Sequence, residues 1–244
     1  MSKFEAGLDG VTFTSNGSKL LGAFYKAAGE SPRPTAVLLH GLPGIEKHLD
    51  IAYRLRDLGW NCLCFHFRGC WGSEGAFSLA GLTDDTRAAV EWVLKQPSAD
   101  KERIALIGGS TGSYPAFFCA AADSRIRAVV GISPLIEPTA FEFPEQMADE
   151  FAGLLHGVTG QDLLEQWNDL PSLSDSLSAF LLRPLLLVAA EKDDIFPPSD
   201  YADSIAAFSN IQLIRHAESD HGFSVCRPWL VKTVTDWLVA ELGT

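Results

Sequence analysis

The sequence has 244 residues with a formal net charge of −12, and 47% of its residues are hydrophobic. A chain of this length and composition buries roughly three quarters of its unfolded surface, which argues against a disordered or fibrous protein and removes the need for a disulfide or metal staple. The excess of acidic side chains repels phosphate backbones and anionic lipids, which argues against nucleic acid and membrane partners.

The first predicted element is a β-hairpin, in which Val11–Phe13 and Leu20–Tyr25 are joined by turn residues 15–18 at the edge of a sheet. From residue 35 onward, short apolar runs alternate with longer amphipathic ones, which is typical of a parallel sheet with helices on both faces. The expected strands are Thr35–Leu39, Asn61–Phe67, Arg103–Ile107, Ala128–Ile132, Leu185–Ala189 and Ile211–Ile214. The expected helices span about 47–58, 82–96, 112–123, 198–208 and 229–242, and Pro228 is placed to open the last one. We therefore expect one α/β domain over residues 1–244.

One segment interrupts this alternation, because residues 133–183 contain no strand-like run. Two short amphipathic helices are predicted there, over about 144–155 and 161–170. An insertion at about 134–183 leaves the carboxyl end of a central strand, where α/β sheets bind ligands. It is therefore a candidate lid, and the alternative is an ordinary connection with no role in binding.

The first residues, the apolar stretches and the cysteines bear on the cellular location of the protein. The first residues lack the apolar core of a signal peptide, and no stretch approaches the roughly 18 apolar residues of a membrane span. The five cysteines are odd in number and lie mostly in apolar runs, which indicates buried free thiols rather than disulfides or metal ligands. We expect a cytoplasmic protein without a metal site.

The strongest chemical signal is Gly108-Gly109-Ser110-Thr111-Gly112, which follows an expected strand and precedes an expected helix. A serine on such a sharp turn needs small neighbours, because the backbone passes close to itself there. The spacing fits neither of the glycine-rich patterns that bind phosphate. Ser110 is therefore the candidate nucleophile.

A serine hydroxyl needs a general base at neutral pH. Among six histidines, His221 lies in a polar loop between the last strand and the last helix, from which it can reach the nucleophile turn. His216 ends the last strand and fits a structural role better. The acid that orients the base is expected after strand 185–189, where either Asp193 or Asp194 can serve.

The order Ser, Asp, His and the Asp-His-Gly-Phe segment at 220–223 resemble the α/β-hydrolase superfamily, and within it small esterases near the dienelactone-hydrolase and feruloyl-esterase groups. The resemblance covers about residues 10–242. It implies a mostly parallel sheet of about eight strands with helices on both faces and a small helical lid. It also implies Asp193 as the acid, and the backbone N–H groups of Leu42 and Thr111 as the oxyanion donors.

The loop at 68–75 departs from the family pattern, because Trp71 stands where a glycine is usual and His66 where an aspartate is common. Dienelactone hydrolases proper use a cysteine nucleophile, so that particular activity is not expected of Ser110. The surplus apolar residues of the insertion are expected to line an acyl or aryl pocket near Leu42. The expected pocket residues are Trp71, Leu135, Met147, Leu164 and Phe223.

These features together predict an enzyme that hydrolyses small carboxylic esters, with short acyl or aryl groups, through an acyl-enzyme and without a metal or organic cofactor. Thioesters and amides need the same machinery and stay as alternatives. A non-catalytic ligand receptor on the same fold is the alternative from another class, since fold does not imply function. The sequence carries no signal for the oligomeric state.

Overall fold

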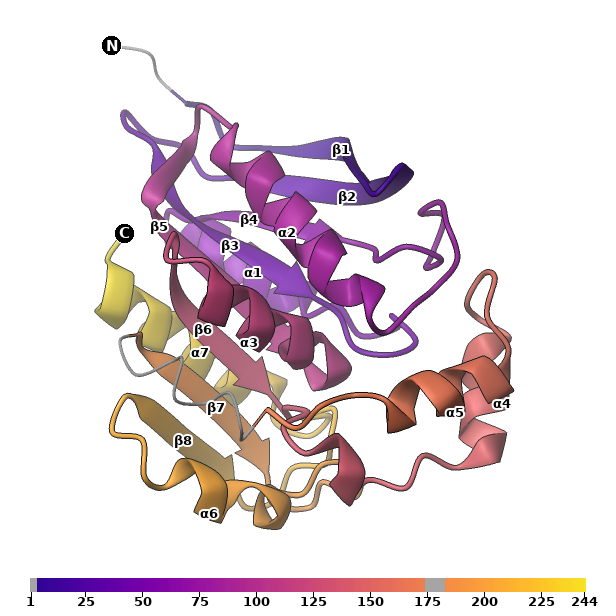
Figure 1. Cartoon of the computed structure of the whole chain (residues 1–244). Coiled ribbons are helices and arrows are strands. Elements are labelled where there is room, and N and C mark those ends of the chain that lie inside the picture. The colour runs from indigo at the N-terminus through magenta and orange to yellow at the C-terminus, as the bar shows by residue number, and fades with distance from the viewer. Residues whose placement is uncertain (1–3, 174–182) are drawn as a thin grey trace.

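The structure, a computed structural model, describes residues 4–173 and 183–244, and its centre is one sheet of eight strands (Figure 1). The strand order is β1-β2-β4-β3-β5-β6-β7-β8. β1 pairs antiparallel with β2 and β2 with β4, while all pairs from β4 to β8 are parallel. The strands are Gly7–Ser15, Ser18–Lys26, Arg33–Leu39, Asn61–Phe65, Ala99–Gly109, Ile126–Ile132, Leu185–Ala190 and Ile211–His216 for β1 to β8.

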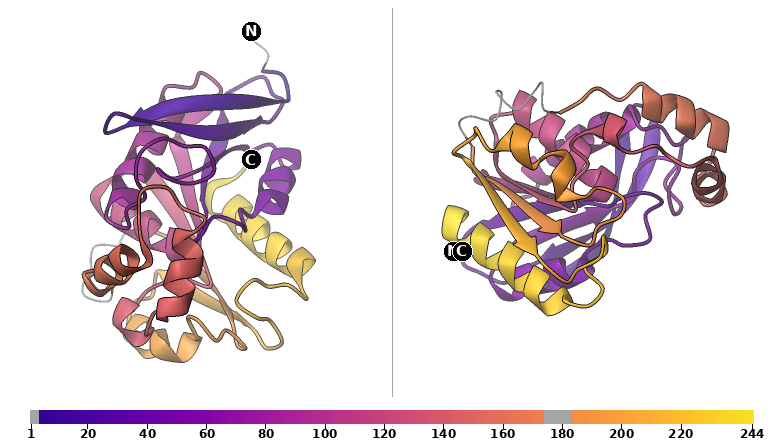
Figure 2. Two further views of the ribbon diagram at one scale, coloured as in Figure 1. Left: turned by 90° about the vertical axis from the view of Figure 1, so that its right-hand side faces the viewer. Right: turned by 90° about the horizontal axis from the view of Figure 1, so that it is seen from below.

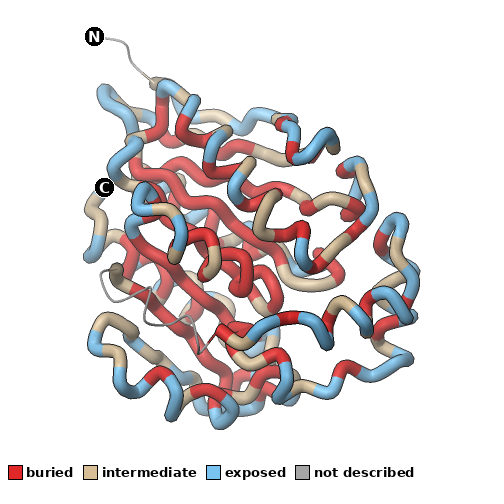
Figure 3. The backbone as a smooth tube through the Cα atoms, in the orientation of Figure 1, coloured by how far each residue is buried: buried red, intermediate tan, exposed pale blue. Residues whose placement is uncertain are grey.

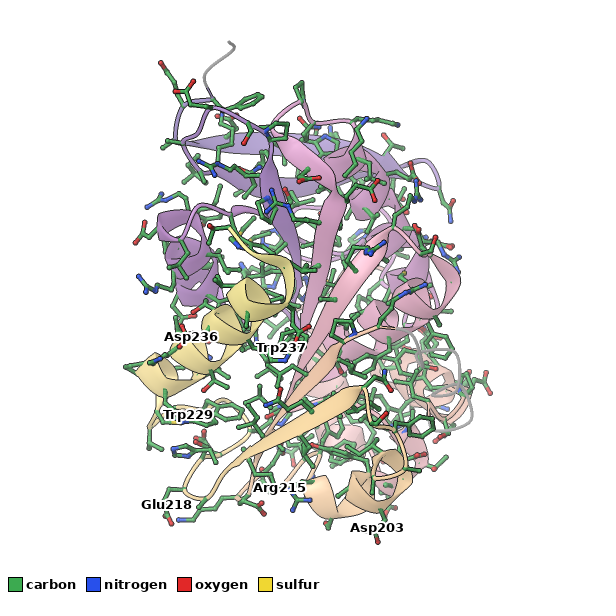
Figure 4. All side chains as sticks on the ribbon, turned by 90° about the vertical axis from the view of Figure 1, so that its left-hand side faces the viewer. Asp203, Arg215, Glu218, Trp229, Asp236 and Trp237 are labelled. Atoms are coloured by element: carbon green, nitrogen blue, oxygen red, sulfur yellow. The ribbon has the colours of Figure 1, made fainter. Side chains whose placement is uncertain are left out.

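Helices cover both faces of this sheet, as Figures 1 and 2 show. α2 (Gly81–Leu94) and α3 (Ser113–Ala122) lie on one face, and α1 (Leu49–Asp57) and α7 (Arg227–Leu242) lie on the other. The central strands are buried along most of their length because side chains on both of their faces are covered (Figure 3). Trp237 points from α7 toward the sheet and is 9% exposed, whereas Asp236 lies on the outer side of the helix (Figure 4).

The expected architecture is confirmed: a mostly parallel sheet of eight strands with helices on both faces and the edge hairpin β1–β2. One predicted helix differs. In place of a helix over 198–208, the chain forms a 3-10 turn at Pro198–Asp200 and a short helix α6 at Ala202–Ile205. Tyr201 separates the two with φ −137° and ψ −11°, outside the helical region, and its side chain is buried.

The insertion after β6 forms two helices, α4 (Glu145–Ala152) and α5 (Gly160–Asn168). Thr159 and Asp162 form a reciprocal capping box at the start of α5. The insertion is fastened to the loop after β4, since the backbone amide of Phe77 donates to His156 O and that of His156 donates to Gly69 O, each at 2.8 Å. The predicted lid ran over about 134–183, and its residues 174–182 lie outside the described part of the chain.

The remaining global features concern thiols, membranes and metals. All five cysteines are free, and four of them are buried. Over residues 4–173 and 183–244, we find neither a helix of the length and apolarity that a bilayer crossing requires nor a group of three or more side chains suited to hold a metal ion.

Candidate active site

Ser110 sits on a sharp turn between β5 and α3, where residues Ser110–Gly112 form a single 3-10 turn. Its φ of +53° lies in the left-handed region, which is strained for a residue with a side chain. Glycine is required on both sides. A Cβ on Gly108 would collide with the backbone of Gly112 and Ser113, and one on Gly112 would collide with carbonyl oxygens at the end of β3. The turn therefore lifts the hydroxyl of Ser110 clear of the sheet.

Three side chains from three strand ends form a continuous series of hydrogen bonds. Nε2 of His221, in the loop after β8, lies 2.9 Å from Oγ of Ser110. Nδ1 of the same ring lies 2.9 and 2.8 Å from the two carboxylate oxygens of Asp193, in the loop after β7. Because parallel strands present their carboxyl ends at one edge of the sheet, residues 83 and 111 positions apart in sequence from Ser110 meet there.

The environment of Asp193 keeps it ionised beside the histidine. Burial acts to raise the pKa of this carboxyl, but hydrogen bonds from His221 and from the backbone amides of Phe196 and Ile195 outweigh burial, so the pKa is lowered. The neighbouring Asp194 is exposed. Of the two acids that the sequence left open, Asp193 is the one at hydrogen-bond distance from His221.

Leu42 and Thr111, the two residues expected to supply the oxyanion donors, are in direct contact. The backbone amide of Leu42 donates to the side-chain hydroxyl oxygen of Thr111 at 2.8 Å. Gly41 passes so close to Ser110 that a Cβ would lie 2.8 Å from the serine Cβ. The loop that carries Leu42 is therefore held directly against the nucleophile turn.

His40 supports this loop rather than the chemistry. Its Nδ1 bonds to Gly41 O at 2.8 Å, and its Nε2 accepts from the amide of Phe67 at 3.3 Å. Burial lowers the pKa of His40 to about 4, so the ring is neutral at pH 7. His216 likewise stays away from Ser110, because its Nδ1 bonds to Ser219 Oγ at 2.8 Å and its ring packs on Trp229.

A small cavity of about 90 Å³ opens beside Ser110. Its described walls come from Gly41, Leu42, Glu46, His48, Gly109, Ser110, Ile132, His221 and Gly222. The loop after β3, the nucleophile turn and the histidine loop therefore form this cavity, and the described part of the insertion contributes no wall to it.

None of the five predicted pocket residues is among the described residues that line this cavity. Phe223 is fully buried on the α7 face, where it stacks on Trp229 at a centroid distance of 6.1 Å. Leu135 is 1% exposed, and its amide donates to Ser113 Oγ at 2.9 Å behind the turn. Trp71 is 45% exposed and lies over the loop after β3, where its Nε1 donates to Pro43 O at 3.0 Å.

Met147 and Leu164, the two pocket residues predicted in the insertion, are half-buried against the core on the α2–α3 face. The cavity beside Ser110 therefore gives no support to the pocket assignment of these two residues. Apolar periodicity identifies which side of a helix is covered, but it does not say whether a core or a ligand covers it.

The insertion reaches the site through a series of aromatic rings instead. Trp167 of α5 stacks on Phe196 at 6.1 Å with an interplanar angle of 11°. Phe196 in turn meets the ring of His221 edge-on at 5.5 Å. Phe141 also contacts Phe196, at 5.5 Å. Sequence reasoning missed this support, because Phe196 and Trp167 carry no signal beyond being apolar.

His48 and Glu46 are further cavity residues that the sequence reasoning missed. His48 is the residue before α1 and falls inside the helix that the sequence predicts over about 47–58. The one available signal was its place within the loop that follows His40-Gly41-Leu42.

The sequence was compared with family models and with known proteins. A family model described as alpha/beta hydrolase fold matches residues 34–165. An uncharacterized protein of Mycobacterium tuberculosis H37Rv is 34% identical over 113 residues, which cover 46% of this chain and 40% of that protein. The quorum-quenching protein AidA of Acinetobacter baumannii is 30% identical over 139 residues, covering 54% of this chain and 45% of that protein. Both matches thus span less than half of the relative's length.

Among solved structures, Est1E from Butyrivibrio proteoclasticus with ferulic acid bound has a TM-score of 0.79 at 17% identity, over 96% of this chain and 100% of that chain. At this level of identity the likeness shows a shared fold.

Proposed function

The chain belongs to the α/β-hydrolase family, and on that premise we propose that it is a serine hydrolase that cleaves small carboxylic esters through an acyl-enzyme. The observation that carries the proposal is the unbroken series Ser110–His221–Asp193, with heavy-atom distances of 2.8 to 2.9 Å. A nucleophile, a base at hydrogen-bond distance and an acid that orients the base are the groups that acyl transfer needs.

In the proposed mechanism, Oγ of Ser110 attacks the ester carbonyl while Nε2 of His221 accepts its proton. The histidine then gives this proton to the leaving alcohol, and it activates water to hydrolyse the acyl-enzyme. The carboxylate of Asp193 holds the imidazole with its proton on Nδ1 and stabilises the imidazolium that forms. The mechanism uses no metal or organic cofactor.

The developing oxyanion is assigned to the backbone N–H groups of Leu42 and Thr111, and such a donor contributes about 3–4 kcal/mol. In the free protein, the hydroxyl oxygen of Thr111 occupies the acceptor position on the Leu42 amide. A bound carbonyl oxygen therefore has to share the Leu42 N–H with the hydroxyl of Thr111 or displace that hydroxyl from it. The cavity of about 90 Å³ favours a short acyl or alcohol group beside Ser110.

Covalent labelling tests the proposal against a non-catalytic receptor on the same fold. A fluorophosphonate probe should add to the peptide that contains Ser110, and the protein should hydrolyse p-nitrophenyl acetate. Ser110→Ala should lose both, while Ser224→Ala, which alters an exposed serine in the histidine loop, should keep both. A folded protein that is not labelled at Ser110 and hydrolyses no ester would exclude this function.

A further inference from the structure

His48 occupies an unusual position for a residue that the proposed mechanism does not use. It is the residue before α1 and has a left-handed φ of +53° with no side-chain capping bond. Its side chain is 8% exposed and lines the same cavity as Ser110 and His221. Strained backbone at a cavity wall is found where the position of a side chain matters.

The neighbours of His48 fix where its ring carries the proton. Nη1 and Nη2 of Arg227 lie 3.2 and 3.3 Å from Nδ1 of the ring. A guanidinium only donates, so Nδ1 must accept and the proton sits on Nε2. Arg227 is itself held by Asp50, whose two oxygens lie 2.6 and 2.9 Å away. The tautomer is therefore set by an Asp50–Arg227–His48 series that runs from the surface to the cavity.

The ring is also neutral at pH 7. Burial lowers the pKa of His48 to about 4, and the nearby charges of Arg227 and His221 act in the same direction against Glu46 and Asp50. His48 thus offers an N–H donor at the cavity wall and is not a second general base.

Gly109 places this donor beside the nucleophile. A Cβ at position 109 would collide with Nε2 of His48, so the ring fills the space that a side chain next to Ser110 would take. Within residues 4–173 and 183–244, Nε2 makes no hydrogen bond to another protein group. Because His48 lines the cavity beside Ser110, a ligand oxygen that enters the cavity can accept a hydrogen bond from this N–H.

We propose that His48 forms a subsite in which Nε2–H binds an uncharged acceptor oxygen of the substrate. The enzyme then prefers esters that carry an ether, hydroxyl or carbonyl oxygen near the scissile group over alkyl esters of the same length. The oxygen is uncharged because two carboxylates, those of Glu46 and Asp50, flank the single guanidinium of Arg227 beside this wall and disfavour an anion. This inference rests on the proposed esterase function and adds the class of ester.

Isosteric substrate pairs test the subsite. On the acyl side, p-nitrophenyl methoxyacetate is compared with p-nitrophenyl butyrate. On the alcohol side, 2-methoxyethyl acetate is compared with n-butyl acetate. Each pair exchanges one oxygen for one CH₂. The kcat/KM ratio within a pair, divided by the same ratio in a variant, cancels the intrinsic reactivity of the esters.

In at least one pair, His48→Phe and His48→Leu should lower the oxygen-to-CH₂ ratio by about 5–10-fold, which is the effect of one hydrogen bond. His48→Gln keeps an N–H donor and should retain more of the ratio than either apolar variant. Wild-type protein also gives a test without any variant, since its ratio should exceed the ratio of the two alkaline hydrolysis rates in that pair.

A wild-type ratio equal to the alkaline ratio in both pairs would overturn the subsite, as would ratios that stay unchanged in a folded apolar variant. Failure of the proposed function has a different signature, because the wild-type protein would then hydrolyse none of the four esters and resist the fluorophosphonate.

Discussion

Two segments leave neighbouring strand ends at the site, and they are held in place in opposite ways. The nucleophile turn after β5 is shaped by its own glycines, because Gly108 lets the chain pass the backbone of Gly112 and Ser113, and Gly112 lets the turn lie against the end of β3. The insertion after β6 is shaped over a long range, by rings such as Trp167 and Phe196 that lie 29 positions apart. Local sterics can be read from sequence, whereas the partners of an aromatic ring cannot.

The nucleophile turn and the insertion also differ in their roles at the site. The turn presents Ser110 directly to the cavity, and the insertion contributes no described wall to it. The insertion instead packs Trp167 and Phe141 against Phe196, the residue whose ring contacts His221. We therefore expect the turn to control chemistry and the insertion to control how firmly the histidine is held.

The largest effect should come from the turn. Ser110→Ala removes the nucleophile and should lower kcat by on the order of 10⁶, with little change in stability because alanine fills the same position. Steady-state kinetics and thermal unfolding measure the two quantities. A folded variant that kept a tenth of wild-type turnover would contradict the assigned role.

The second-largest loss of kcat should come from changing Asp193, the acid that orients His221. Asp193→Asn keeps the shape but disturbs the tautomer of His221, and should lower kcat by about 10⁴. Asp194→Asn is the matched control, and its exposed side chain should change kcat by less than about threefold. A reversed order in the two kinetic measurements would exchange the roles of these residues.

The insertion should act more weakly on chemistry and strongly on stability. Trp167 is 4% exposed, so Trp167→Ala should lower the free energy of unfolding by about 3–5 kcal/mol. It should also lower kcat of the folded fraction by about tenfold, because Phe196 loses the ring that supports it against His221.

Trp92→Ala is the control for this comparison, since Trp92 packs on Phe13 and Phe24 near the edge hairpin. It should destabilise the protein without lowering kcat per folded molecule. Equal kcat in the two variants would mean that the aromatic series does not position the histidine.

Acid should destabilise the strand-end loops. Burial lowers the pKa values of His40, His48 and His66 to about 4, and all three lie in these loops. Between about pH 6.5 and 4 the unfolded chain binds protons that the folded chain excludes, so stability falls as the pH falls.

Each such histidine adds a slope of up to about 1.4 kcal/mol per pH unit. Urea unfolding at a series of pH values should give a shallower slope of stability against pH for His40→Gln than for the wild type. A slope that is the same in His40→Gln as in the wild type would show that His40 is not neutral in the folded protein.

The smallest effects are expected at Met147 and Leu164. Both pack against the core and do not line the cavity at Ser110. Met147→Ala and Leu164→Ala should therefore change the relative kcat/KM among acetate, butyrate and hexanoate esters by less than about twofold. A larger shift in this chain-length profile would make the insertion a wall of the pocket after all.

The sequence by itself determined the strands, the edge hairpin and the two residues Ser110 and His221 as candidates, because each depends on neighbours within about ten positions. Apolar period, glycine spacing and the order of loops are local quantities. The sequence also predicted a helical insertion and narrowed the acid to two adjacent residues.

The tertiary structure decided what depends on burial and on contacts between distant segments. It placed Asp193 rather than Asp194 against His221, and buried Phe223 in the core. It also brought Arg227 from the last helix to His48, 179 positions earlier, and so fixed the tautomer of a ring beside Ser110. Residue type and spacing cannot supply such facts, because the proton position and the exposure of a side chain are set by whichever groups the fold packs around it.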